Sequence, residues 1–150
     1  MSSQDIQFDH SLLGKEMAAG PFEVTKEAIL GFCKAVGETN PASLDEAAAR
    51  RAGYRGLLAP PTLCTAFIRL VVRPDIRLRW GRSRFHAGQV VEPLAPICAG
   101  DSLTAFSRLK DVYSKTGRSG TMVYIVWETD FSNQRGEKVA AVQESFAVRE

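Results

Sequence analysis

The pattern of apolar and polar positions predicts helices in the first half of the chain and strands in the second. Residues 22–24 (Phe-Glu-Val) predict a short strand, after which Thr25 can cap a helix that ends at Gly37. The apolar residues of this helix recur at helical spacing, and they are Ile29, Leu30, Cys33 and Val36. One face of the helix should therefore be buried.

Two further helices are expected before the strands begin. Ser43 and Glu46 have the spacing of a capping box, so a short and mostly solvated helix should start at Ser43 and end near Gly53. Pro60 and Pro61 then lead into a third helix from about Thr62 to Val72. Because this third helix is apolar on nearly every face, we expect it to be buried.

In the second half of the chain, apolar and polar residues alternate along the sequence, as they do in β-strands. Extended segments are expected at 85–91, 102–113, 121–131 and 138–148, and glycine-containing turns at 115–120 and 133–136 join the last three as hairpins. An antiparallel sheet should therefore wrap one buried helix, which is the α+β hot-dog architecture. We expect the apolar run Met122–Trp127 to be covered on both faces, and edge-to-edge dimerisation of two such sheets would protect their open edges.

Length and composition fit one domain over residues 1–150. No apolar run approaches the ~20 residues of a membrane span, and the start of the chain lacks the pattern of a secretory signal, so a cytoplasmic protein is expected. The three cysteines, Cys33, Cys64 and Cys98, are too few and too widely spaced for a disulfide framework or a metal knuckle. We interpret them as small buried hydrophobic residues and expect no metal and no cofactor.

Charge is distributed unevenly along the chain. The net charge is only +2, yet residues 69–84 contain six arginines against the single acidic residue Asp75. This segment would suit an anionic ligand or an acidic carrier protein, whereas nucleic-acid binding would require a basic domain throughout. A solvated arginine-rich loop is the alternative interpretation.

The segment Gly37-Glu-Thr-Asn-Pro-Ala-Ser43 resembles the Gly-Asp-x-Asn-Pro-x-His signature of the MaoC-like hot-dog family. This family comprises the (R)-specific enoyl-thioester hydratases and 3-hydroxyacyl-thioester dehydratases. The segments 49–57, 99–103 and 111–118 and the turn into the third helix also resemble it, so the similarity extends from about residue 20 to the end. The resemblance implies an acyl-thioester substrate, carried by coenzyme A or by an acyl carrier protein.

In that family the Asp and His act as base and acid around one water molecule. Here Glu38 occupies the Asp position, where it could still hold the water, and Ser43 occupies the His position. A serine hydroxyl does not titrate near neutral pH and cannot replace the histidine. The family's Ala-His-Gly turn, whose glycine N–H stabilises the thioester oxygen, is replaced by residues 59–61, and Pro60 and Pro61 have no N–H to donate.

The resemblance explains these losses, because some family members pair one catalytic hot-dog half with one that only shapes the acyl tunnel. This chain resembles the non-catalytic, N-terminal half, the FAS1-like dehydratase type. A heterodimer with a catalytic hot-dog subunit is therefore expected. The alternative is an active homodimeric hydratase or dehydratase in which Glu38 works with a substitute acid such as His86, although the position of His86 at the start of a strand favours a structural role. Thioester hydrolysis is a weaker third possibility, for which no signature is evident.

The residues expected to contact substrate come from the signature, from the turn before the third helix and from the arginine segment. Arg79 and Arg82 should hold phosphates, because the forked guanidinium suits phosphate oxygens. The full set of expected substrate-binding residues is Asn40, Pro41, Ser43, Pro60, Pro61, Thr62, Arg79, Arg82 and Gln89. Asp101 follows Gly100 at a strand entry, where we expect a turn or capping role.

Overall fold

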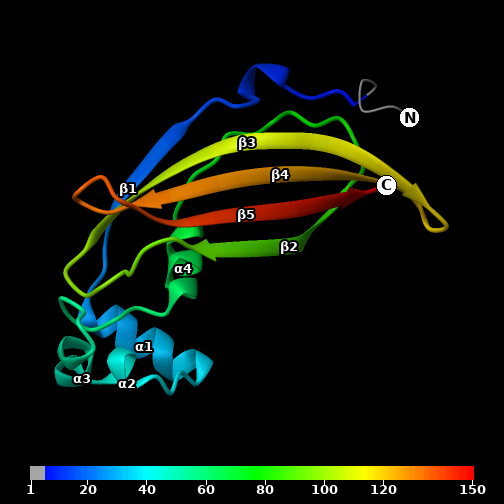
Figure 1. The fold of residues 1–150 in the computed structure, drawn as a ribbon. Helices are drawn as coiled ribbons and strands as arrows, with labels where there is room; N and C mark the ends of the chain where they lie inside the picture. Colours follow the sequence, from blue (N-terminus) through cyan, green and yellow to red (C-terminus); the bar gives the residue numbers. More distant parts are fainter. Residues whose placement is uncertain (1–5) are drawn as a thin grey trace.

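A five-stranded antiparallel sheet forms most of the molecule, with the helices gathered against it (Figure 1). The computed structural model describes residues 6–150. The expectation about a secretory signal depends partly on residues 1–5, which lie outside the described residues. The strands are β1 (Met17–Glu23), β2 (Ser83–Pro93), β3 (Ser102–Gly117), β4 (Gly120–Ser132) and β5 (Lys138–Arg149). Their order in the sheet is β1-β3-β4-β5-β2, so β1 and β2 form its edges.

The helices precede the long strands in the chain. They are α1 (Lys26–Val36), α2 (Pro41–Leu44), α3 (Glu46–Arg51) and α4 (Cys64–Ile68), with short 3-10 turns η2 (His10–Leu12) and η3 (Pro61–Leu63). Figure 1 shows α1, α2 and α3 together at one end of the sheet, with α4 between them and the strands. Among residues 6–150, no helix is long and apolar enough to cross a membrane.

The strands and the bounds of the first helix agree with the sequence pattern, but Leu30 and Val36, expected on its buried face, are 37% and 56% exposed. The side chain of Thr25 caps α1 by accepting a hydrogen bond from the N–H of Ala28, and Gly37 ends the helix in the left-handed conformation with φ of 72°. The hairpins β3–β4 and β4–β5 form with their turns where glycine was expected. The expected strand at residues 22–24 belongs to β1, which begins earlier, at Met17.

The prediction that Ser43 caps the second helix was wrong. Two short helices replace the single one, because Asn40 caps α2 and Asp45 caps α3 with their side-chain oxygens. Pro41 fixes the first position of α2, which leaves Ser43 inside that helix and only 1% exposed. Gly53 follows the end of α3, as expected, with a positive φ of 93°.

The buried helix is also shorter than the pattern predicted. It ends at Ile68 instead of Val72, and Leu70 and Val72 are 62% and 88% exposed. Pro74 disfavours helical backbone just before it, and the chain instead crosses the sheet, where Ile76 is buried and its carbonyl accepts a hydrogen bond from the N–H of Asp9. The segment after α4 therefore covers the far end of the sheet.

The covered face of the sheet carries two apolar clusters. The first lies beneath α1 and α4 and includes Phe131, and the second lies beneath the N-terminal stretch and the segment after α4 and includes Trp127. On β4 the polar Thr129 stands between these two residues, and Ser107 on β3 is its cross-strand neighbour at 2.9 Å. The core is thus divided by a short line of buried polar side chains.

The apolar run of β4 is explained by its central place in the sheet. Val123, Ile125 and Trp127 point into the second cluster, whereas Val126 points to the opposite face and is still only 5% exposed. Trp80 also packs against this cluster, so both tryptophans are packing residues. Cys33, Cys64 and Cys98 are buried free thiols, as expected.

Candidate functional site

The segment that resembles the catalytic signature forms a tight turn after α1. The Oε1 atom of Glu38 accepts hydrogen bonds from the N–H groups of Thr39 at 3.0 Å and Asn40 at 2.9 Å. The Glu38 carboxylate is therefore bonded to the backbone of its own turn. A residue used in this way fixes the path of the chain between α1 and α2.

The next three signature positions, Asn40, Pro41 and Ser43, also take part in local structure. Asn40 accepts a hydrogen bond from the N–H of Ala42 at 3.1 Å, which caps α2. The backbone carbonyl of Ser43 accepts a contact of 3.7 Å from the thiol of Cys33 on α1, which joins the two helices. Pro41 is exposed at the start of α2. Asn40 and Pro41 therefore begin α2, and Ser43 joins it to α1.

The turn into α4 is tied to the neighbouring loop. The N–H of Ala59 donates to the carbonyl of Ile97 at 2.8 Å, immediately before the two prolines. Thr62 follows them, and its carbonyl accepts a hydrogen bond from the hydroxyl of Thr65 at 2.7 Å. Pro60 and Pro61 have no N–H, so neither can donate to an oxyanion at this turn.

Cys64 begins α4 beside this turn and could be mistaken for a nucleophile. Its thiol donates to the carbonyl of Pro61 at 3.1 Å. Burial raises the pKa of Cys64 to about 11, so the thiol stays protonated at neutral pH. A protonated, buried thiol is a poor nucleophile, and Cys64 acts as a packing residue.

One cavity lies beside the turn into α4, and another lies beside α4 itself. The first, of about 210 Å³, is apolar and adjoins the turn at Pro61, with Tyr54, Leu58 and Val139 in its walls. The second, of about 420 Å³, has both polar and apolar side chains in its walls and is called the polar cavity here. Its lining includes His86 and Gln89, two residues singled out from the sequence. Thr62 and Glu38 are absent from the lining of both cavities.

The polar cavity contains a residue that the sequence analysis missed. Glu144 on β5 is 5% exposed, and its Oε1 accepts a hydrogen bond of 2.6 Å from Arg73. Gln89 and His86 approach the other oxygen, Oε2, at 3.4 Å and 3.5 Å. Glu144 occupies an inward position between Val142 and Phe146, so the strand's period of two was the signal that could have revealed it.

His86 and Glu38 are separated in this chain. His86 lies on the edge strand β2, with its ring edge-on to Phe146 at 5.2 Å, whereas Glu38 belongs to the turn after α1. The substitute acid proposed for Glu38 is therefore not beside it within one copy of the chain. His86 instead accompanies Gln89 and Glu144.

The arginine segment spreads over several parts of the surface and core. Arg73 pairs with Glu144 and lies over the ring of Trp127 at 5.1 Å. Arg84 lies over Phe146, and burial lowers the pKa of its guanidinium. Arg79 lines a shallow cavity of about 290 Å³, while Arg82 is exposed and its N–H donates to the carbonyl of Arg149. The six arginines thus form no single cluster.

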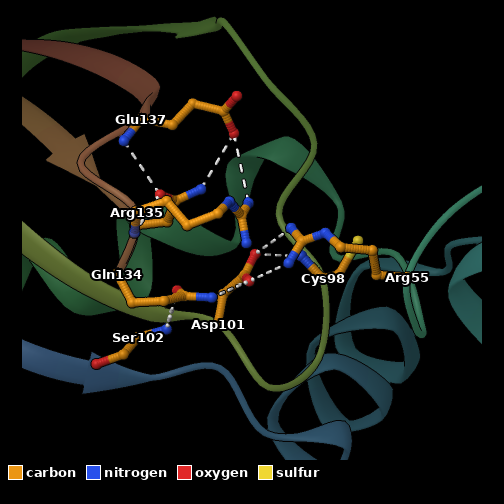
Figure 2. Close-up of polar contacts among 8 residues, drawn as sticks. Arg55, Cys98, Asp101, Ser102, Gln134, Arg135 and Glu137 are labelled. Carbon is orange, nitrogen blue, oxygen red and sulfur yellow. Dashed lines mark hydrogen bonds and ion pairs between the residues drawn. The ribbon is translucent and has the colours of Figure 1, made fainter.

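Asp101 is a structural residue, in agreement with its expected turn role. Figure 2 shows its carboxylate between the guanidinium of Arg55, the side chain of Gln134 and the backbone of Cys98. Burial raises the pKa of Asp101, but the hydrogen bonds from Cys98, Arg55 and Gln134 outweigh that effect and hold the pKa below its ordinary value. The ionised carboxylate therefore ties together three loops near the apolar cavity.

Within residues 6–150, no group of three or more His, Cys, Asp and Glu side chains has the arrangement of a metal site. The polar cavity is lined by the charged groups of Arg69 and Glu144 and by the imidazole of His86, whereas the lining of the apolar cavity contains no charged side chain. The apolar cavity can hold a hydrocarbon or an uncharged linker, and the polar cavity can hold a group that both donates and accepts hydrogen bonds.

Comparisons with known proteins agree with this architecture. The family model described as "FAS1-like, dehydratase domain region" matches residues 11–142. A UPF0336 protein from Streptomyces griseus subsp. griseus is 35% identical over 118 residues, which cover 75% of this chain and 78% of that protein.

Solved structures share the fold. The MaoC-like dehydratase from Rhodospirillum rubrum superposes with a TM-score of 0.68 at 26% identity, covering 95% of this chain and 96% of that one. The HadBC (3R-hydroxyacyl-ACP dehydratase) complex from Mycobacterium tuberculosis gives a TM-score of 0.71 at 22% identity, covering 92% of this chain and 98% of that one. The resemblance inferred from the sequence is confirmed: this chain is a hot-dog protein that belongs to the FAS1-like dehydratase-domain family.

Proposed function

We propose that this chain is the acyl-thioester-binding, non-catalytic subunit of an (R)-specific hydratase or dehydratase. A partner hot-dog subunit supplies the Asp/His pair. The observation that carries the proposal is the local structure of the signature segment, in which Glu38 is bonded to its own turn and Ser43 is buried inside α2. Hydration of an enoyl thioester requires a base and an acid around one water molecule, and this segment supplies no such pair.

The turn before α4 supports the same proposal. A thioester carbonyl gains negative charge in the transition state, and a preorganised N–H at this turn stabilises that charge. Loss of one such donor typically costs ~100- to 1000-fold in rate. Because Pro60 and Pro61 cannot donate, this chain would bind the acyl group without activating it.

The apolar cavity beside Pro61 gives the accessory role a binding surface. Its walls come from the loop before β3 and from the turn into α4, and Val139 closes it from β5. An acyl or pantetheine segment could lie there. The HadBC complex offers a precedent for assembly, since it is a two-chain 3R-hydroxyacyl-ACP dehydratase of the same fold.

The test is enoyl-thioester hydration by the purified chain, alone and with a partner. We expect the chain alone to hydrate crotonyl-CoA at a rate near background, and activity to appear with a hot-dog subunit that has an intact Asp/His signature. Glu38→Gln and His86→Ala should leave the rate of the mixture within about threefold, since neither residue transfers a proton.

The outcome that overturns the proposal is robust turnover by the isolated wild-type chain that Glu38→Gln or His86→Ala abolishes. That result would establish the homodimeric hydratase. Isothermal titration with a saturated acyl-CoA provides the complementary measurement, because the accessory subunit should bind the thioester even where it does not convert it.

Arg79 and Arg82 remain the proposed contacts for the phosphates of the carrier. Replacing both with glutamine should weaken acyl-CoA binding at low salt, because each removes a charge-assisted contact. The difference from wild type should shrink as ionic strength rises, since exposed charges are screened. If wild type and the double variant bind acyl-CoA with equal affinity and equal salt dependence, these arginines do not contact the ligand.

A further inference from the structure

A further cavity, of about 270 Å³, lies where the segment after α4 crosses the sheet. We call it the arginine cavity, because two guanidinium side chains are in its walls. No residue of its lining belongs to the lining of the apolar cavity or of the polar cavity, so it is a separate site. The segment after α4, β2 and β4 contribute the residues used below, which are Arg73, Asp75, Ile76, Arg84, Ile125 and Trp127.

Aromatic rings hold both guanidinium groups in place. The guanidinium of Arg73 lies over the ring of Trp127 at 5.1 Å, and that of Arg84 lies over the ring of Phe146 at 4.6 Å. A ring contacts the flat face of a guanidinium, whereas the N–H donors point outward in its plane. These contacts therefore position the two arginines without using their hydrogen-bond donors.

Both arginines have donors without a partner in the chain. Arg73 uses one terminal nitrogen, which donates to Glu144 Oε1 at 2.6 Å and to the hydroxyl of Thr129 at 3.4 Å. The Nε of Arg73 is buried and makes no hydrogen bond. Among residues 6–150, no carboxylate pairs with Arg84. Because a buried N–H without an acceptor is unfavourable, a ligand that supplies an acceptor to Arg73 should be stabilising.

The charges in the walls of the arginine cavity favour an anion. Partial burial lowers the pKa of the Arg84 guanidinium, and the positive charge of Arg73 lowers it further. Asp75 raises this pKa by less than Arg73 lowers it. Asp75 is exposed, and its Oδ1 already accepts a hydrogen bond from the N–H of Arg77 at 2.9 Å. The repulsion between the two arginines is therefore only partly offset by the chain itself.

We propose that the arginine cavity binds a small organic carboxylate. The carboxylate accepts hydrogen bonds from the forked donors of Arg84 and from the Nε of Arg73. The apolar part of the ligand rests against the walls formed by Ile76, Ile125 and Trp127. A volume of about 270 Å³ is small for a ligand pocket, so the ligand is a compact one. This site is independent of the proposed acyl-thioester binding.

Other classes of ligand fit the cavity less well. A cation would meet two guanidinium groups. An uncharged amide or alcohol would leave the repulsion between Arg73 and Arg84 in place. Inorganic phosphate could pair with both arginines, but it has no apolar part to rest against Ile125 and Trp127. An organic carboxylate satisfies both the charged and the apolar walls.

The test is isothermal titration calorimetry of the purified chain at constant ionic strength. The probe is cyclohexanecarboxylate, a compact carboxylate with an apolar ring. Cyclohexanecarboxamide has nearly the same shape without the charge, and inorganic phosphate has charge without the ring. We expect the carboxylate to bind with a Kd of about 0.1–1 mM, and at least ~10-fold more tightly than either comparison, because charge-assisted hydrogen bonds are the stronger ones.

Variants identify the cavity as the place of binding. Arg84→Gln should weaken binding of the carboxylate by at least ~10-fold, and it leaves the Arg73–Glu144 pair in place. Arg118→Gln removes the same charge at an exposed position of the β3–β4 turn and should bind as wild type does. Asp75→Asn should strengthen binding about two- to threefold, because it removes a charge that repels the ligand. Circular dichroism verifies that each variant is folded.

The proposal is overturned if the carboxylate and the amide bind equally, or if Arg84→Gln binds the carboxylate as wild type does. Phosphate binding at least as tight as that of the carboxylate overturns the assignment to an organic acid. Binding that is unchanged or weaker in Asp75→Asn places the ligand away from the two arginines and also overturns it. Acyl-CoA titrations test the proposed function separately, so failure of one proposal leaves the other standing.

Discussion

Ser43 illustrates how a catalytic position can become part of the helical scaffold. It is 1% exposed and lies within α2, which Asn40 caps and Pro41 begins. A histidine at this position would have to enter space that neighbouring side chains already fill. In this chain the position therefore serves the packing of α2.

We therefore expect that Glu38→Asp combined with Ser43→His will not produce an active hydratase. Overpacking at Ser43 should lower the free energy of unfolding by about 1–3 kcal/mol, as measured by urea denaturation. Thr39→His, at an exposed neighbouring position, is the matched control and should change stability little. Crotonyl-CoA hydration well above background in the double variant would contradict this expectation. It would show that the residues at positions 38 and 43 alone had prevented catalysis.

Asp101 gives a second prediction at the scale of single residues. Its pKa is held below the ordinary value of 3.8, so its contribution to stability is complete above about pH 4 and is lost as the pH falls through the folded-state pKa. Asp101→Asn should destabilise the protein by ~1–3 kcal/mol at neutral pH, because it disturbs the bonds to Arg55 and Cys98.

The pH profile separates this effect from general destabilisation. The difference between wild type and Asp101→Asn should narrow as urea titrations move from about pH 7 to about pH 3, since the wild-type carboxyl becomes protonated. Asp111→Asn, at an exposed position, serves as the control with little effect at either pH. A constant difference across this range would contradict a role for the ionised carboxylate.

The secondary-structure elements show which parts of the fold follow from local pattern. The strands β3, β4 and β5 begin within one residue of their predicted positions, because alternation and glycine turns fix a hairpin locally. The start of α2 was misplaced because Asn40 and Ser43 are both good capping residues. Pro41, which suits the first helical position, favours the earlier one.

The candidate site was harder to predict because its contacts are distant in sequence. Arg73 and Glu144 are 71 residues apart, and the arginine was grouped with its neighbours as part of one charged segment. The fold directs Arg73 inward and Arg82 outward, a separation that depends on how the chain crosses the sheet after α4. Composition and local spacing contain no information on that path.

The edge strand β2 is the feature from which we predict how the chain assembles. It pairs with β5 on one side only, and Val90 and Phe85 are 63% and 45% exposed on it. An open edge with exposed apolar side chains favours pairing with a second sheet. We expect the chain to form a dimer through this strand, either with a second copy or with a catalytic hot-dog subunit.

Val90→Lys should weaken that association, because it places a charge on the exposed apolar face of the edge strand. Multi-angle light scattering at micromolar concentration should show a dimer for wild type and a shift toward monomer for the variant. Thr121→Lys, in the β3–β4 hairpin, provides a control that should remain dimeric. A monodisperse wild-type monomer in the absence of any partner would exclude self-association through β2.

The line of buried polar side chains across the covered face of the sheet also has a consequence for local unfolding. Ser107, Thr129 and Glu144 separate an apolar cluster held by the helices from one held by the N-terminal stretch and the segment after α4. Apolar contact is interrupted at this line, so the two clusters can loosen as separate cooperative units. In amide hydrogen exchange, the amides around Ile125 and Val148 in the second cluster should then exchange through a local opening of that cluster. The amides around Leu103 and Val139 in the first cluster should require a larger opening of the molecule. Ligand bound at the line between the clusters would couple the two units and slow exchange at both ends of the sheet.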